Sequence, residues 1–215
     1  MKEFIVGRPA LLIIDMQHDF LDVDAVTPAP GAESIIPLVA GVADAARAAG
    51  VPVIYTQETH RPGRIDSGRE LDPGAGAYLT GGDLLAPVPE HCVEGTRGNE
   101  IVPELAPRVG DLRIVKRRYN CFIGTDLDLL LRNLDVETLL ITGVDSNVCV
   151  LWTVGHAFQL DYHVRVIEDC VAGTSPPEHE AALLIMLNLT AHSHIKSVDV
   201  FFALQSLRLN KRELV

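Results

Sequence analysis

The chain alternates short apolar runs with helix-like stretches, and this alternation constrains its fold more than any other feature. The runs are rich in aliphatic and β-branched residues, as expected of strands buried on both faces of a parallel sheet. Most are followed by a stretch with the spacing of an amphipathic helix, which predicts a three-layer α/β/α sandwich. The predicted strands are residues 10–15, 51–56, 111–116, 136–142 and 163–168, with a last short strand at 197–201.

Three of these apolar runs end at chemically active residues. The first ends at Asp15, the third at Lys116, and the fourth leads into the turn Gly143-Val-Asp-Ser-Asn-Val-Cys149. Right-handed crossovers place the carboxyl ends of parallel strands on one edge of the sheet, where active sites gather. We therefore expect Asp15, Lys116 and Cys149 to converge on one site. Taken alone, Asp15 and Lys116 equally fit a structural ion pair at the strand ends.

Cys149 lies between a predicted strand and a helix predicted over residues 148–160. Free backbone N–H groups and the helix dipole converge at a helix N-terminus, and both favour thiolate, the reactive form of cysteine. The same N–H groups can hold the oxyanion that forms when a thiolate attacks a carbonyl. The alternative is that Cys149 is a small buried apolar residue, as most free cysteines are.

Length and charge narrow the class of protein. The chain has 215 residues, which suits one domain with a large core. Its net charge of -11 argues against nucleic acid and anionic membranes as partners. No stretch approaches the ~20 apolar residues of a membrane span. The four cysteines show no close-paired spacing, which is typical of free thiols in a reducing cytoplasm.

The segment from residue 57 to about residue 107 interrupts the alternation. It is rich in proline and glycine and shows no sustained period. A loop of this length inside a compact domain is usually functional. We predict that it forms a lid or pocket wall within a single domain spanning residues 1–215, and that it holds the determinants of substrate choice.

Three motifs together resemble those of one family. They are Ile13-Ile-Asp-Met-Gln-His-Asp-Phe20, Val115-Lys-Arg-Arg-Tyr119 and Gly143-Val-Asp-Ser-Asn-Val-Cys-Val150. In order and spacing they resemble the isochorismatase-like cysteine hydrolases, a superfamily that includes nicotinamidases, N-carbamoylsarcosine amidohydrolases and biuret hydrolases. The resemblance extends from residue 10 to about residue 190. It implies a parallel six-stranded sheet of order 3-2-1-4-5-6 between helices.

The resemblance also implies roles for individual residues. Asp15, Lys116 and Cys149 would form a catalytic triad, and the N–H groups of Asp145 and Cys149 an oxyanion hole shaped by a cis peptide bond at Val144–Asp145. Asp15 would take the thiol proton, Cys149 would attack an amide or ureido carbonyl, and water would hydrolyse the thioester. Isochorismatases proper have no cysteine at this position, which argues against vinyl-ether hydrolysis.

A candidate metal site distinguishes branches of the superfamily. Nicotinamidases bind a metal through Asp-x-His and a later His, and this chain has Glu58-Thr-His60 and His91 at the corresponding places. Two histidines and a carboxylate suit zinc, iron or manganese. A further loop histidine of some nicotinamidases has no counterpart, however, and biuret-hydrolase-like members have a similar Glu-x-His without a metal. We predict no cofactor, with Glu58 and His60 bonding the loop or the substrate.

The predicted function is cysteine-dependent hydrolysis of a C–N bond in a small amide or ureido compound in the cytoplasm. Two alternatives stay open: a metal-containing nicotinamidase-like amidase, and a non-hydrolytic small-molecule-binding or redox-sensing protein on the same fold. Because family members are commonly dimers or tetramers, we expect a homodimer or homotetramer, with the apolar residues 198–207 as an interface element. The predicted substrate-binding residues are Phe20, Glu58, His60, Tyr119 and Phe122.

Overall fold

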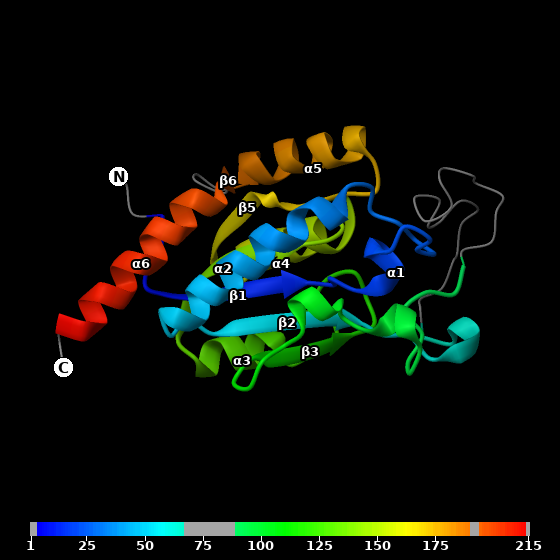
Figure 1. Cartoon of the computed structure of the whole chain (residues 1–215), viewed down its shortest axis with the longest axis horizontal. Coiled ribbons are helices and arrows are strands. Elements are labelled where there is room, and N and C mark those ends of the chain that lie inside the picture. The colour runs from blue at the N-terminus through cyan, green and yellow to red at the C-terminus, as the bar shows by residue number, and fades with distance from the viewer. Residues whose placement is uncertain (1–3, 67–88, 190–193, 214–215) are drawn as a thin grey trace.

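A six-stranded parallel sheet forms the centre of the molecule, as seen in a computed structural model that describes residues 4–66, 89–189 and 194–213 (Figure 1). The strand order β3-β2-β1-β4-β5-β6 confirms the predicted order and fold class. Every pair of neighbouring strands runs parallel. The strands are β1 (Arg8–Ile14), β2 (Val53–Glu58), β3 (Leu112–Lys116), β4 (Val136–Gly143), β5 (His163–Val171) and β6 (His194–Ile195).

Helices cover both faces of this sheet and complete three layers (Figure 1). α2 and α6 pack on one face, and α3, α4 and α5 pack on the other. In the part of the chain that the structure describes, no helix has the length and apolarity needed to cross a membrane. The helices are α1 (His18–Leu21), η1 (Ala32–Ile35), α2 (Ile36–Ala48), α3 (Leu127–Asn133), α4 (Leu151–Gln159), α5 (Pro176–Leu189) and α6 (Ser197–Glu213).

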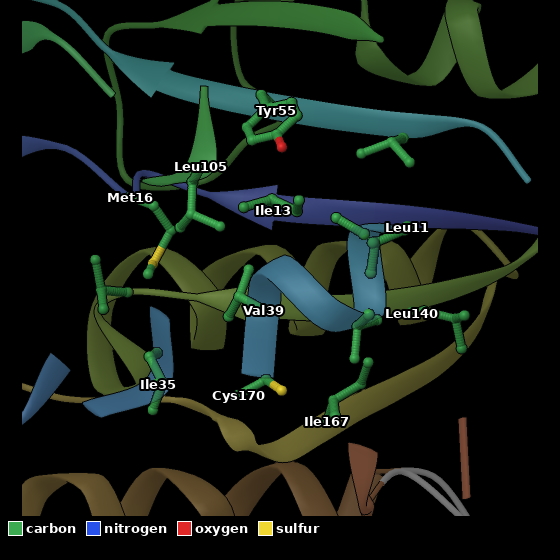
Figure 2. Packing of buried hydrophobic residues seen from close by; sticks show 14 of the residues in the cluster. Leu11, Ile13, Met16, Ile35, Val39, Tyr55, Leu105, Leu140, Ile167 and Cys170 are labelled. Atoms are coloured by element: carbon green, nitrogen blue, oxygen red, sulfur yellow. The ribbon is translucent and has the colours of Figure 1, made fainter. Parts of the chain in front are cut away.

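The central strand β1 serves both cores because successive side chains of a strand point to opposite faces. Leu11 and Ile13 belong to the cluster under α2, where Figure 2 shows them beside Val39, while Leu12 and Ile14 belong to the opposite cluster. All four are fully buried. Burying each such side chain contributes about 1.5–3 kcal/mol, so this strand anchors the residues that follow it.

The last predicted strand is wrong, because residues 197–201 begin helix α6 and the sixth strand precedes them. Val200 and Leu204 are buried apolar residues of this helix, and their spacing of four is that of one helical face. The N–H and hydroxyl of Ser197 donate to the two carboxylate oxygens of Asp169 at 2.8 and 2.7 Å, which fixes the start of the helix. The short apolar run that starts the helix imitates a strand, since periodicity over five residues does not separate the two structures.

The described parts of the segment between β2 and β3 pack against the rest of the molecule. β2 runs to Glu58, so the excursion begins later than predicted, and residues 67–88 lie outside the described residues. Beyond them the chain returns to the core through buried Cys92, Val102 and Leu105. Isolated bridges also join Gln17 to Ile101 and His60 to Val93. Among the described residues of this segment are the short 3-10 turns η2 (Pro62–Arg64), η4 (Arg97–Asn99) and η5 (Pro103–Leu105).

The register of the central strands brings the functional segments together. Ile14 of β1 pairs with Gly143 of β4, and Glu58 of β2 pairs with Lys116 of β3. Gly143 has a φ of 109°, and a Cβ at this position would lie 2.0 Å from the carbonyl oxygen of Ile14. Only glycine therefore lets β4 end this close to β1. The loops that follow the two strands start from adjacent points.

Candidate active site

Asp15 follows β1 and is fixed by the neighbouring strand β2. Its φ of 50° is uncommon for a residue with a side chain and occurs mainly where the surroundings enforce it. The Thr56 hydroxyl donates to Asp15 Oδ1 at 2.8 Å and accepts from the Asp15 N–H at 3.2 Å. Burial raises the pKa of Asp15, while Lys116 opposes this rise and Glu58 adds to it.

Lys116 lies at the centre of the site, at the end of β3. Its Nζ is 2.6 Å from Asp15 Oδ2, 3.1 Å from Glu58 Oε2 and 3.5 Å from Cys149 Sγ, and its side chain has no exposed surface. Burial alone would lower the pKa of Lys116, but Asp15, Cys149 and Glu58 raise it well above its ordinary value. The ammonium is therefore charged, as a buried cation can be when carboxylates pair with it.

Cys149 lies in η6 (Ser146–Val150), a π-helical turn that continues into α4. Its thiol donates to Glu58 Oε2 at 3.6 Å, and the sulfur and one carboxylate oxygen each of Asp15 and Glu58 lie within 4.8 Å of one another. Burial raises the pKa of Cys149 well above its ordinary value; Lys116 opposes the rise and three carboxylates increase it. Burial and these carboxylates favour the thiol, against the thiolate that the helix N-terminus is expected to favour.

The loop that carries the cysteine is tied to the rest of the sheet. It begins with the peptide bond Val144–Asp145, which is cis, as the resemblance implied. The Ser146 N–H donates to the carbonyl of Ala172 at 2.7 Å, and the Ser146 hydroxyl lies 2.8 Å from Nδ1 of His179 in α5. These bonds join the loop to the segments that follow β5 and restrict the backbone on which Cys149 is mounted.

Glu58, His60 and His91 form a second cluster that shares a residue with the first. His60 Nε2 lies 3.0 Å from Glu58 Oε1, and His91 Nε2 lies 3.9 Å from the same oxygen. Burial would raise the pKa of Glu58, but Lys116 and both histidines hold it well below its ordinary value. Ligand atoms of the three residues lie within 4.8 Å of one another, so the set fits a divalent metal ion by donor type.

The predicted aromatic substrate residues lie in different surroundings. Phe20 is buried, and its ring is 6.4 Å from an imidazole of the second cluster in an edge-on arrangement. Tyr119 is half-buried and packs against the core on the cysteine side of the sheet. Phe122 is 8% exposed and packs on the rings of His156 and Tyr162, at 5.2 and 6.1 Å. These contacts favour a packing role for Phe122 over the predicted substrate contact.

Several supporting residues were not found by sequence reasoning. Gln17 donates through Nε2 to the carbonyl of Glu58 at 2.8 Å and accepts from the Glu58 N–H at 2.8 Å. Thr56 fixes the Asp15 carboxylate, and Glu58, predicted only as a substrate or metal residue, also contacts both Lys116 and Cys149. Thr56 and Glu58 both lie at the carboxyl end of β2, next to β1, and that position was the available signal.

The arrangement supplies the groups that acyl transfer requires. A buried thiol, a carboxyl group of raised pKa and a charged ammonium lie side by side. They can act as nucleophile, base and electrostatic stabiliser, respectively. The fold and this site define a class of parallel α/β proteins that carry a cysteine beside an acid–lysine pair at the carboxyl edge of the sheet.

The chain belongs to the isochorismatase family, since its residues 9–193 match the isochorismatase domain. It is 37% identical over 184 residues to a probable inactive nicotinamidase of Arabidopsis thaliana, covering 84% of this chain and 88% of that protein. It is 30% identical over 210 residues to the ureidoacrylate amidohydrolase of Pseudomonas syringae pv. syringae, covering 91% and 82%. A Pyrococcus horikoshii pyrazinamidase solved in complex with zinc is 29% identical, with a TM-score of 0.74 and coverage of 88% and 99%. The predicted family is confirmed.

Proposed function

We propose that the protein is a cysteine-dependent amidohydrolase that cleaves a C–N bond of a small amide or ureido compound through a thioester. The observation that carries this proposal is the contact of one buried Lys116 Nζ with both Asp15 Oδ2, at 2.6 Å, and Cys149 Sγ, at 3.5 Å. A structural ion pair has no need of a thiol at this distance. Similarity to a ureidoacrylate amidohydrolase supports the class of substrate.

In the proposed first step Asp15 removes the thiol proton as Cys149 attacks the substrate carbonyl. Because burial raises the pKa of Asp15, its carboxylate is a stronger base than an exposed aspartate, which suits proton transfer from a thiol. Lys116 stays charged and stabilises the carboxylate before the transfer and the developing thiolate during it.

The same residues carry out the remaining steps. The carbonyl oxygen becomes an oxyanion that accepts from the N–H groups of Asp145 and Cys149, each worth about 3 kcal/mol. Asp15 gives its proton to the leaving nitrogen, the C–N bond breaks, and the acyl group stays on sulfur as a thioester. Water, deprotonated by Asp15, then attacks the thioester. The C–S bond breaks, Asp15 returns the proton to sulfur, and the acid product leaves with the Cys149 thiol restored.

Residues of the second cluster and its neighbours would contact the substrate in this reaction. Glu58 orients Lys116 and the thiol through Oε2, and His60 fixes the other carboxylate oxygen. Phe20 and Tyr119 remain the proposed aromatic contacts.

We propose that turnover requires no metal ion. Glu58, His60 and His91 would hold a divalent ion if one binds, and the ion would supply a Lewis acid that orients a polar group of the substrate. The nucleophile, base and oxyanion donors are all provided by other residues, so none of the steps above depends on it. Glu58 also has a role without an ion, because its Oε2 accepts from Lys116 at 3.1 Å.

The alternative function is non-hydrolytic binding or redox sensing on the same fold. It is supported by the similarity to a probable inactive nicotinamidase. A binding protein, however, has no use for a buried base next to the thiol. Turnover of any amide or ureido compound with release of ammonia separates the two functions.

A homodimer or homotetramer is the proposed assembly. On α5, the outer side chains of Leu184, Ile185 and Leu187 are 61%, 50% and 47% exposed. On α6, Val198 and Phe202 of the predicted interface element are 51% and 57% exposed. Apolar surface of this kind commonly marks an interaction site. Light scattering coupled to gel filtration should give a dimer or tetramer mass, and a monomer at micromolar concentration would contradict the proposal.

Ammonia release from nicotinamide, biuret and N-carbamoyl compounds tests the proposed function directly. Wild-type protein should hydrolyse at least one of them, Cys149→Ser should lose this activity, and acid-quenched enzyme should carry an acyl adduct on Cys149 by mass spectrometry. Cys121→Ala is the matched control, since Cys121 is a buried thiol near Lys116 without a hydrogen bond to it. Full activity of Cys149→Ser would refute the assignment.

A further inference from the structure

Asp145 is a buried acid whose side chain has no role in the reaction described above. It is 3% exposed, and its Oδ1 has no hydrogen-bond partner among the described residues. Its backbone is fixed, because the Asp145 carbonyl accepts from the N–H groups of Val148 and Val150 at 3.0 and 3.1 Å. Buried polar groups are almost always paired, so an unpaired carboxyl oxygen in a fixed loop needs an explanation.

The charged groups around this carboxyl group are those of the active site. The charged groups that act on it are Asp15, Glu58, Lys116 and His91, and it acts in turn on Cys149. These five residues belong to the two clusters of the active site. No cation forms an ion pair with Asp145 in the part of the chain described by the structure, so its buried Oδ1, four residues before Cys149 in the same turn, is available to a bound group.

The protonation state of Asp145 decides which groups it can bind. Burial raises the pKa of Asp145 to about 8, with Asp15 and Glu58 adding to the rise and Lys116 and His91 opposing it. A neutral carboxyl group offers a carbonyl acceptor and an O–H donor side by side. An amide-type N–H next to a carbonyl offers the complementary pair.

We propose that the Asp145 side chain is a positioning residue that accepts a hydrogen bond from a substrate N–H on the side of the scissile carbonyl opposite the leaving nitrogen. This inference rests on the proposed function and narrows its substrate class. A ureido carbonyl carries nitrogen on both sides, so one nitrogen leaves and the other remains for Asp145. A simple carboxamide has carbon on that side and cannot make this bond. The site therefore favours ureido compounds over carboxamides.

Biuret and malonamide are the probes that isolate this bond. They differ by one central group, which is N–H in biuret and CH₂ in malonamide. A site built to hydrogen-bond a polar group discriminates strongly against an analogue that lacks it. In wild-type protein, kcat/KM should be higher for biuret than for malonamide. Asp145→Ala should lower the biuret-to-malonamide ratio about tenfold, and Asp145→Asn, which keeps the carbonyl acceptor, should restore most of it.

Because the ratio compares two substrates with the same protein sample, a partial loss of folded protein cancels. If Asp145→Ala lowers kcat/KM equally for both probes, or lowers neither, the biuret-to-malonamide ratio is unchanged. Either outcome would overturn the inference, and equal losses would assign the side chain a structural role. N-carbamoylglycine and succinamate, which differ by the same N–H to CH₂ exchange, should repeat the result.

Binding is measured separately, by protection of Cys149 from iodoacetamide. Biuret should protect wild-type protein better than malonamide does, and Asp145→Ala should remove this difference. If wild-type protein hydrolyses none of the probes while biuret protection depends on Asp145, the proposed function fails and the inference holds. If neither compound is hydrolysed and biuret protects no better than malonamide, the inference fails as well.

Discussion

Replacing Lys116 by methionine should destabilise the protein severely as well as inactivate it. The change removes the counterion of two carboxylates, Asp15 with 0% and Glu58 with 2% side-chain exposure, at 2.6 and 3.1 Å. Glu58 keeps its histidine partners, whereas Asp15 keeps only the Thr56 hydroxyl. Breaking a buried pair by removing one partner costs about 3–5 kcal/mol. That is a large share of the roughly 5–15 kcal/mol by which a domain is stable.

Urea unfolding at pH 7, followed by far-ultraviolet circular dichroism, measures this cost. Lys196→Met is the matched control, because Lys196 pairs with Glu168 but its side chain is 55% exposed, and exposed pairs contribute at most about 1 kcal/mol. The double variant Asp15→Asn/Lys116→Met should be about 2 kcal/mol more stable than Lys116→Met alone, since it leaves no unpaired charge on Asp15. A loss under about 1 kcal/mol for Lys116→Met would refute the reasoning.

Three further predictions follow from single features. Gly143→Ala should lower the free energy of unfolding by at least ~2 kcal/mol, because the new Cβ would clash with the backbone of Ile14. Gly155→Ala, with open space around it in α4, should leave stability unchanged or raise it by up to ~1 kcal/mol. Equal effects of the two substitutions on thermal unfolding would contradict this reasoning. The pKa of Asp145 rises from 3.8 to about 8 on folding, so the stability of the wild-type protein should fall as pH rises through this window. The stability of Asp145→Asn relative to wild type should increase by up to about 1.4 kcal/mol per pH unit. A constant stability difference between the two proteins in urea unfolding from pH 5 to 7.5 would refute the shift. Chelator-stripped protein should keep its turnover, and loss of activity restored by zinc, iron or manganese would assign Glu58, His60 and His91 as ligands.

The convergence of Asp15, Lys116 and Cys149 was predictable because Asp15 and Lys116 end apolar runs and Cys149 lies in the turn that follows another. In a parallel sheet with right-handed crossovers, such positions meet at one edge whatever the intervening sequence. The contact of Glu58 with Lys116 was not predictable in the same way. It depends on the register of β2 and β3, which pairs these residues directly, and register is set by packing that no local pattern reveals.

Burial explains what local sequence could not show. The helix terminus near Cys149 is a local feature, whereas the effects of burial and of the Asp15 and Glu58 carboxylates on its pKa depend on distant segments. The helix at Ser197 was mistaken for a strand because its buried residues, Val200 and Leu204, are identified only by what they pack against. The cis bond at Val144–Asp145 came from the resemblance and not from the residues themselves.

The bridge between His60 and Val93 holds the described part of the segment between β2 and β3 next to the end of β2. β1, which Asp15 follows, and β4, which leads into the turn of Cys149, are buried at nearly every position, so their amides should exchange with solvent hydrogen only on global unfolding. The turns η4 and η5 are each three residues long and should open at lower free energy. Under mild heating or denaturant, the described part of the segment between β2 and β3, which carries His91, should therefore loosen while the cysteine and its base keep their positions. Discrimination between substrates should be lost before the reactivity of the thiol.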